Sequence, residues 1–155
     1  MSRLRPVFSL ILVSLATLLI SCGGPNVAVA PPTYTQSQIE KIQEYVPDIV
    51  AVQERGSELQ KLIENEDWID VGTFIHGPIT EAKLNMNFIA SNLLPEQQKQ
   101  ARKIVRDMLN NLVKIDQAAG AGNSRQALSA YDAVFGDINQ FLDLVPAEAL
   151  SDEPV

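Results

Sequence analysis

The sequence predicts an all-α protein folded as an up-down-up-down four-helix bundle. Apolar residues recur at helical spacing over long stretches between prolines, and only a few residues connect one stretch to the next. No stretch shows the strict alternation of apolar and polar residues that is typical of a β-strand. Helices joined by such short connections bury their apolar stripes by packing antiparallel against one another.

Two helical stretches form the first half of the predicted bundle. The first covers about residues 37–65 and should be interrupted or kinked near Pro47, because proline lacks the amide donor of a helix. The second begins at Asp67, with Asp70 placed as in a capping box, and should bend at Gly77-Pro78. Their predicted inner faces consist of Ile49, Val52, Gly56, Leu59, Ile63, Trp68, Val71, Ile75, Ala82, Met86, Ile89 and Leu93.

Two further stretches form the second half. The third begins at Pro95, a favoured residue for a first helical turn, and stops at Gly120 and Gly122. The fourth opens at Asn123, with Gln126 three residues later. Their predicted inner faces consist of Ala101, Val105, Met108, Leu112, Ile115, Ala119, Ala127, Tyr131, Val134, Ile138, Phe141 and Val145.

The N-terminal segment, residues 1–21, has the pattern of a signal peptide. Two arginines precede an apolar run over residues 7–20 that is too short to span a bilayer comfortably. The run ends at Ser21-Cys22, which resembles the bacterial lipobox, a signal whose cysteine is acylated and becomes the first mature residue. The pattern predicts a lipid anchor at Cys22; an ordinary cleavable signal followed by a chance cysteine is the alternative.

Three segments follow the signal peptide. Residues 22–36 should form an acylated N-terminus and a flexible linker, because residues 23–36 carry no charge and three prolines. At about 3.3 Å per residue this linker reaches roughly 40 Å when fully extended. The bundle should cover residues 37–146, and residues 147–155 should form a frayed tail.

Charge and residue content exclude several classes of function. The formal net charge of -7 argues against a nucleic-acid-binding protein. One histidine and one cysteine cannot supply paired Glu-x-x-His ligands, a Cys-x-x-Cys-His haem site or a zinc-thiolate site. There is no Gly-x-Ser-x-Gly elbow and no phosphate-binding glycine loop. We therefore expect a protein that is not an enzyme and has no cofactor.

Two possibilities for ligand binding stay open in the sequence. His76 with Met86 or Met108 could ligate a b-type haem. An acidic cluster at the first helix–helix turn could attract a divalent cation, or it could be a solvated turn with a capping aspartate. The cluster consists of Glu64, Glu66, Asp67 and Asp70.

A basic stripe on the third helix is the main candidate for docking. Its members recur at the i, i+3, i+4, i+7 spacing of one helix face, opposite the apolar residues, and are Lys99, Arg102, Lys103 and Arg106. Residues 95–119 hold five basic and three acidic side chains, whereas residues 37–66 hold three and seven. The stripe is either a solvated face or a surface that docks on an acidic protein or on anionic head groups.

Two single residues are further docking candidates. His76, beside the expected bend, either lies at the surface or bonds a backbone carbonyl freed by Pro78; in a functional role it belongs to a partner interface or is an adventitious surface metal ligand. Trp68 either packs in the core or anchors an interface.

Several short segments, taken in order, resemble the PsbQ family, whose cyanobacterial lipoprotein form is the closest in pattern. The resemblance covers about residues 40–146 and agrees with the lipobox-like Cys22. The segments are Asp67-Trp68, Phe74-Ile75-His76-Gly77-Pro78, Leu93-Leu94-Pro95, Asp116-Gln117-Ala118-Ala119, Tyr131 and Phe141-Leu142-Asp143-Leu144.

The resemblance implies a non-catalytic extrinsic subunit of photosystem II, anchored by lipid to the lumenal side of the thylakoid membrane. Such a subunit would stabilise or help assemble the oxygen-evolving complex and support its retention of calcium and chloride. Its implied neighbours are the extrinsic PsbO subunit and a core antenna protein. Two other classes stay open: a lipid-anchored bundle that binds a metal or small ligand in a bacterial envelope, and an envelope scaffold.

Overall fold

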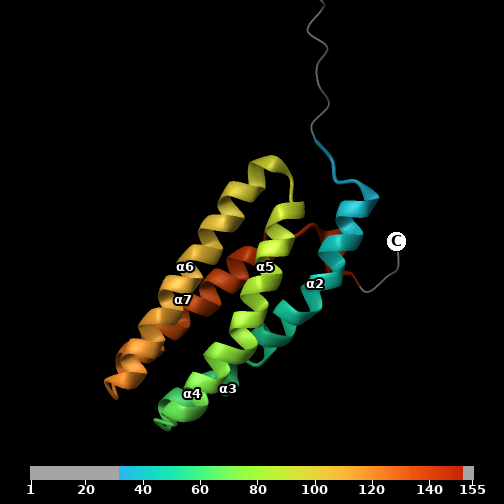
Figure 1. Cartoon of the computed structure of the whole chain (residues 1–155). Helices are drawn as coiled ribbons and strands as arrows, with labels where there is room; N and C mark the ends of the chain where they lie inside the picture. The colour runs from blue at the N-terminus through green and yellow to red at the C-terminus, as the bar shows by residue number, and fades with distance from the viewer. Residues whose placement is uncertain (1–31, 152–155) are drawn as a thin grey trace, which may run out of the picture. The chain divides into compact units, whose positions relative to one another are not determined.

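The computed structural model describes residues 32–151, and every regular element within that range is helical, which confirms the all-α prediction. Four antiparallel rods run alternately down, up, down and up in Figure 1, which is the topology that the sequence predicts. They are formed by α2 (Gln36–Glu54) with α3 (Gly56–Glu64); by α4 (Trp68–Phe74), the π-helix η2 (Ile75–Ile79) and α5 (Thr80–Asn92); by α6 (Pro95–Gly120); and by α7 (Ser124–Leu142). A short helix, α8 (Ala147–Leu150), follows the fourth rod.

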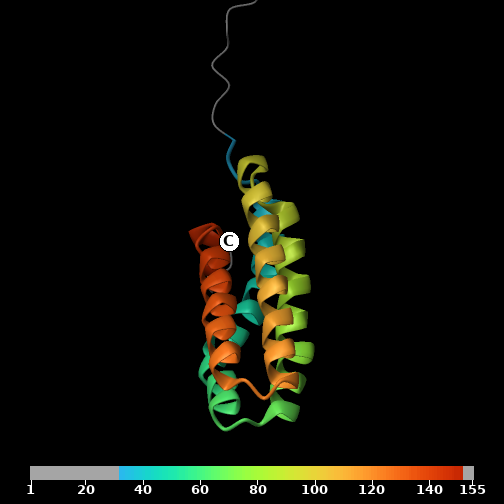
Figure 2. The same ribbon diagram turned by 90° about the vertical axis from the view of Figure 1, so that its left-hand side faces the viewer.

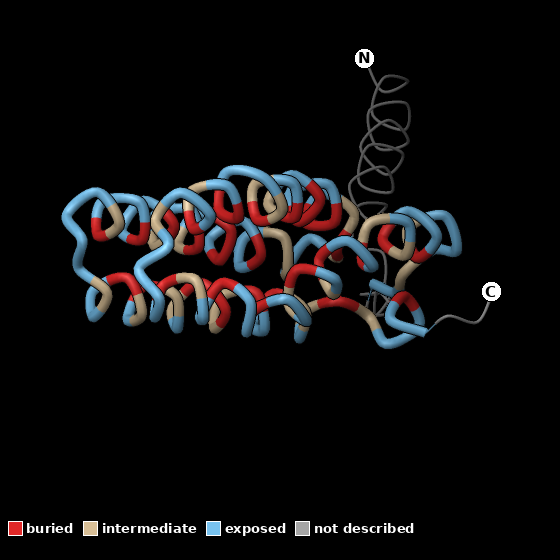
Figure 3. The backbone as a smooth tube through the Cα atoms, turned by 90° about the horizontal axis from the view of Figure 1, so that it is seen from below, coloured by how far each residue is buried: buried red, intermediate tan, exposed pale blue. Residues whose placement is uncertain are grey.

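The rods enclose one apolar core. The most extensive packing is between α6 and α7 and between α2 and α5, while α5 beside α6 and α3 beside α7 complete the ring (Figure 2). Buried positions lie on the inner side of each helix and exposed ones on the outer side (Figure 3). All predicted inner-face residues are buried except Trp68, Ala119 and Tyr131, which are partly buried against the same core.

The first rod begins with a capping box, and it is interrupted at a residue other than the predicted one. Thr35 caps α2: its Oγ1 accepts a hydrogen bond from the Gln38 amide, and the Gln38 side chain accepts one from the Thr35 amide. The interruption expected near Pro47 is wrong in position, because α2 runs through this exposed proline. The rod breaks instead at Arg55, between α2 and α3.

The second rod departs from the sequence prediction at its start. Glu66 has a φ of 58°, which turns the chain so that the Asp67 amide donates back to the Leu62 carbonyl at 2.9 Å. Asp67 makes no side-chain cap, so the capping box predicted with Asp70 is wrong.

At Gly77-Pro78 the chain forms the wider π-helix η2. Pro78 has no amide to donate within this segment, and the Thr80 hydroxyl donates to the Ile75 carbonyl at 2.9 Å. The position at which the sequence predicts a bend is thus occupied by a π-helix.

The third and fourth rods follow the prediction closely. Pro95 is the first residue of α6, and α6 ends at Gly120, with Gly122 at a φ of 64° that favours glycine. Asn123 caps α7 by accepting a hydrogen bond from the Gln126 amide at 3.1 Å.

Both described chain ends are tied to the bundle. Tyr34 Oη donates to Gln97 Oε1 at 2.5 Å, and Gln97 Nε2 donates to the Leu144 carbonyl at 3.4 Å. Tyr34, which belongs to the predicted linker, thus packs on the bundle. The predicted frayed tail is wrong for residues 147–150, because α8 packs on α2 and buries Ala149.

Candidate docking surface

The basic stripe of α6 lies on the outside of the bundle. Lys99, Arg102, Lys103 and Arg106 are all exposed, as the helical spacing predicts. Arg102 donates to Gln98 Oε1 at 3.0 Å, and Lys103 pairs with Asp107. Within residues 32–151, Lys99 and Arg106 form no ion pair. The stripe therefore presents positive charge that neighbouring carboxylates offset only at Lys103.

His76 lies at the surface in η2. Its Nε2 is 3.2 Å from Asp116 Oδ1 of α6, and both side chains are well exposed, at 70% and 58%. The partner that the structure shows for His76 is thus a carboxylate rather than a backbone carbonyl freed by Pro78, which was one of the expected alternatives. His76 thus connects the second and third rods through an exposed pair, a class of contact that contributes little to stability.

Trp68 is the first residue of α4. Its side chain is half-buried and packs on the core cluster. The part that stays accessible leaves both interpretations of Trp68 available, core packing and contact with a partner.

The acidic cluster lies at the turn between α3 and α4, and one of its members contacts the start of α7. Glu64, Glu66, Asp67 and Asp70 are all exposed, and Glu66 Oε1 accepts a hydrogen bond from the Ser124 hydroxyl of α7 at 2.7 Å. Residues 32–151 contain no group of three or more His, Cys, Asp or Glu side chains placed to hold a metal ion. Glu66 thus connects the first helix–helix turn with the start of α7.

Arg55 is a surface residue that the sequence reasoning did not single out. Its guanidinium donates to both carboxylate oxygens of Glu58, at 2.9 and 3.1 Å, and lies 4.8 Å from the centre of the Phe74 ring. The hydrogen bond from Arg55 lowers the pKa of the Glu58 carboxyl. The i, i+3 spacing of Arg55 and Glu58 is a local signal for their pair, whereas the contact with Phe74 depends on the fold.

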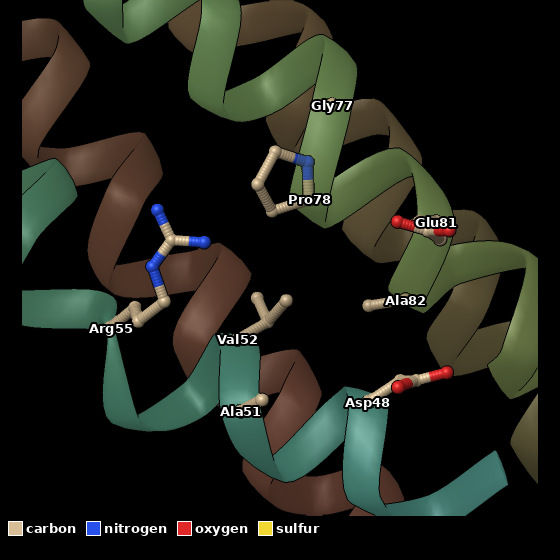
Figure 4. Close-up of a pocket in the computed structure, with 8 residues that line it drawn as sticks. All are labelled: Asp48, Ala51, Val52, Arg55, Gly77, Pro78, Glu81 and Ala82. Carbon is tan, nitrogen blue, oxygen red and sulfur yellow. The ribbon is translucent and has the colours of Figure 1, made fainter.

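Beside Arg55 a hollow of about 290 Å³ opens between α2 and the η2–α5 segment (Figure 4). Carboxylates occupy one end of it and the guanidinium the other; the lining consists of Asp48, Ala51, Val52, Arg55, Gly77, Pro78, Glu81 and Ala82. Asp48 accepts a hydrogen bond from the buried Asn85 at 2.8 Å. Asp48 is thus already engaged in stabilising the contact between α2 and α5.

Exposed apolar side chains are a second feature that sequence reasoning did not single out. Leu84 and Phe88 on α5 and Leu109 and Val113 on α6 are each between 43% and 55% exposed. The signal was present, since each pair has i, i+4 spacing outside the predicted inner face.

Two membrane-related observations bear on the predicted anchor. Cys22 lies outside the described residues, so its acylation stays a prediction. Within residues 32–151, no helix combines the length and the apolar character needed to cross a bilayer.

Fold and surface define an all-α four-helix-bundle protein whose candidate functional groups lie on its outside rather than in its core. The family model described as oxygen evolving enhancer protein 3, PsbQ, matches residues 2–146. A relative named CyanoQ, from Synechocystis sp. (strain ATCC 27184 / PCC 6803 / Kazusa), is 40% identical over 148 residues, which cover 94% of this chain and 98% of the relative.

The chain therefore belongs to the PsbQ family, as the resemblance of its segments predicted. This membership makes it an extrinsic subunit of photosystem II on the lumenal side of the thylakoid membrane.

Proposed function

We propose that this chain is held to the thylakoid membrane by acyl chains on Cys22 and acts on photosystem II by contact alone. In this role it stabilises or helps assemble the oxygen-evolving complex and supports the retention of calcium and chloride, without catalysing a reaction. Membership of the PsbQ family supports the site of action, and the lipobox-like segment ending at Cys22 supports the anchor.

The observation that carries the docking part of the proposal is the exposed basic stripe of α6. The chain has a formal net charge of -7, yet this helix holds five basic and three acidic side chains. Such local reversal of charge steers a protein toward an acidic surface and disfavours other orientations. The PsbO subunit and a core antenna protein are the neighbours that the family resemblance suggests.

The lipid anchor explains why modest docking contacts are sufficient. Each buried methylene of an acyl chain contributes about 0.8 kcal/mol, so two or three chains hold a protein stably at a membrane. A short tether then raises the effective concentration of the bundle near any partner in the same membrane. Trp68 and His76, which lie in the second rod, are further docking residues in this proposal.

Reversing charge on the stripe tests the proposal. The double variant Arg102→Glu/Lys103→Glu should lower the recovery of the chain with detergent-solubilised photosystem II at low salt. At high salt the difference in recovery between the variant and the unmodified chain should shrink, because salt screens the charges of both proteins. Lys61→Glu/Arg125→Glu is a matched control, since it makes the same charge change at exposed positions on α3 and α7. Equal recovery of the two double variants would remove the basic stripe from the interface.

The retention role has its own measurement. Membranes that lack this subunit should lose oxygen evolution when calcium or chloride is depleted, and adding the unmodified chain should restore it. Restoration that requires added calcium and chloride whether or not the chain is present would contradict this part of the proposal.

A further inference from the structure

We propose that a groove between the first and second rods is a second docking site, which receives a lysine- or arginine-bearing segment of a photosystem II protein. The groove consists of the hollow of about 290 Å³ beside Arg55 and a neighbouring hollow of about 220 Å³; Arg55 and Pro78 line both. We call the two hollows together the acidic groove. The inference rests on the proposed function in one respect, namely that the partner belongs to photosystem II.

Two contacts fix how α2 and α5 lie beside each other along this groove. The rings of Tyr45 and Phe88 stack with centroids 5.2 Å apart and an interplanar angle of 18°. Three residues further along α2, Asp48 accepts the hydrogen bond of Asn85, which lies three residues before Phe88. This is the register of two antiparallel helices, and one turn further along α2 it leads into the first hollow.

The lining of the acidic groove carries an excess of negative charge. It has four carboxylates and one guanidinium, a formal net charge of -3: Asp48, Glu58, Asp70, Glu81 and Arg55. Glu58 is paired with Arg55, whereas within residues 32–151 Asp48, Asp70 and Glu81 form no ion pair. Carboxylates that have no cation of their own at a groove favour a cationic partner there.

Arg55 spans the groove without neutralising its acidic end. The guanidinium is held by both carboxylate oxygens of Glu58 and by the Phe74 ring of the second rod. Asp48 and Glu81 lie at the opposite end of the first hollow (Figure 4). An incoming cationic group therefore meets two carboxylates at that end, and Arg55 is already engaged elsewhere.

A side chain of a protein fits this groove better than a free ligand does. Small-molecule sites usually enclose about 300–1,000 Å³, and each hollow is smaller than that. A divalent cation needs several oxygen ligands, and the described residues bring no three His, Cys, Asp or Glu side chains together for one. The ammonium or guanidinium of a partner needs only hydrogen-bond acceptors, which Asp48 and Glu81 supply.

An apolar rim beside the carboxylates offers a second kind of contact. Leu84 and Phe88 follow Glu81 on α5 after one and two helical turns, so they share its side of the helix. They are 51% and 55% exposed. Because the Phe88 ring is already held by Tyr45, less side-chain freedom is lost when a partner packs on it. The partner segment should therefore carry an apolar residue beside its basic one.

The first test neutralises the acidic end of the groove. The full chain is bound to detergent-solubilised photosystem II from membranes that lack only this subunit. Asp48→Asn/Glu81→Gln removes two charges and keeps an acceptor for Asn85, and it should bind about three- to tenfold more weakly at low salt. This difference should shrink at high salt. Asp132→Asn/Glu148→Gln, at exposed positions on α7 and α8, is the matched control and should bind like the unmodified chain.

The second test blocks the groove without changing its charge. Ala51 is exposed and lines the first hollow, so Ala51→Trp should weaken binding at low and high salt alike. Ala147→Trp, at an exposed position on α8, is its control. Thermal unfolding of all four variants shows that a loss of binding does not come from a loss of the fold.

The inference requires that both variants of the groove bind more weakly than their controls. A loss with Asp48→Asn/Glu81→Gln alone would mean that these charges act without entry of the partner, and a loss with Ala51→Trp alone would mean an uncharged contact; either result overturns it. Binding equal to the controls in both tests would overturn the inference and leave the proposed function standing. Failure of the unmodified chain to bind photosystem II would contradict both.

A second copy of this chain is the other cationic partner to test, because the basic stripe of α6 has the matching charge. Sedimentation of the isolated chain at low salt should show a monomer. Self-association that Asp48→Asn/Glu81→Gln abolishes would assign the acidic groove to the stripe of another copy and would overturn the inference.

Discussion

Gly56 shows how tightly the core is packed at the level of one residue. A Cβ placed on Gly56 would lie 2.7 Å from Phe135 Cε1, and that ring is buried and packs on Tyr131 with centroids 4.7 Å apart. Gly56→Ala should therefore destabilise the fold by roughly 1 kcal/mol or more, since overpacking outweighs the gain in helix propensity. Urea unfolding measures the change.

Gly136 provides the matched control. It lies within α7, and a Cβ there would meet nothing within 4 Å. Gly136→Ala should stabilise the fold by about 0.5–1 kcal/mol, because alanine loses less backbone entropy than glycine in a helix. Equal effects of the two substitutions would show that Phe135 does not restrict the space at Gly56.

Asp137 should give stability a specific dependence on pH. Burial raises the pKa of its carboxyl above the ordinary 3.8, although Asn111 Nδ2 donates a hydrogen bond to it at 2.8 Å. Because the folded-state pKa is the higher one, the stability that this group provides is complete below pH 3.8 and is lost as the pH rises through the folded pKa.

Asp137→Asn should therefore raise the free energy of unfolding at pH 7, by no more than about 1 kcal/mol for a partly exposed group. The gain should disappear as the pH falls below the ordinary carboxyl pKa. Unfolding measured at pH 3 and pH 7 tests this, with Asp132→Asn, an exposed position on the same helix, as the control. A gain of equal size at both pH values would contradict the assignment.

For single residues, the sequence predicts which side chains are exposed better than it predicts which other side chains they contact. The exposed position of Lys99, Arg102, Lys103 and Arg106 follows from helix period alone. The contact of His76 with Asp116 spans 40 residues, so it depends on the packing of the second rod on the third. Local sequence patterns contain no information on such a register.

Helix caps are the clearest predictions at the scale of single elements. Asn123 accepts a hydrogen bond from the Gln126 amide, whereas Asp67 makes no side-chain cap. Asn123→Ala should cost about 1 kcal/mol of stability, the usual value for a lost N-cap. Asp67→Ala should cost clearly less. Thermal unfolding of both variants measures the difference, and equal losses would indicate that Asp67 caps α4 in solution.

The sequence predicts the helix boundaries at a first-turn proline, a glycine or a capping residue, but it does not predict the break in the first rod. Pro95, Gly122 and Asn123 lie where the sequence indicates. Pro47 does not break α2, and the break at Arg55 comes before Gly56, where the Phe135 ring leaves no room for a Cβ. A tertiary contact of this kind fixes a boundary that no local propensity reveals.

At the scale of the whole molecule, helix period and short connections were sufficient to predict the bundle. Each apolar stripe has only one way to leave water, which is to face the other three rods. The face that the bundle offers to partners is harder to predict, because exposed side chains of different helices become neighbours only when the helices pack, as His76 and Asp116 do.

The lipid anchor is a prediction about the whole chain. Cys22→Ser should move the protein from the detergent phase to the aqueous phase in a Triton X-114 partition, because the variant cannot carry acyl chains. Its recovery with photosystem II in intact membranes should also fall, since the tether no longer concentrates it there. Partition of the variant into the detergent phase would show that the anchor is elsewhere.

The central claim is that this bundle works while attached to photosystem II. The most direct measurement is fractionation of solubilised thylakoid membranes, followed by detection of the chain across the fractions. The account predicts that the chain travels with the oxygen-evolving photosystem II particles at low salt and leaves them at high salt. A chain that sediments apart from these particles at every salt concentration would contradict it.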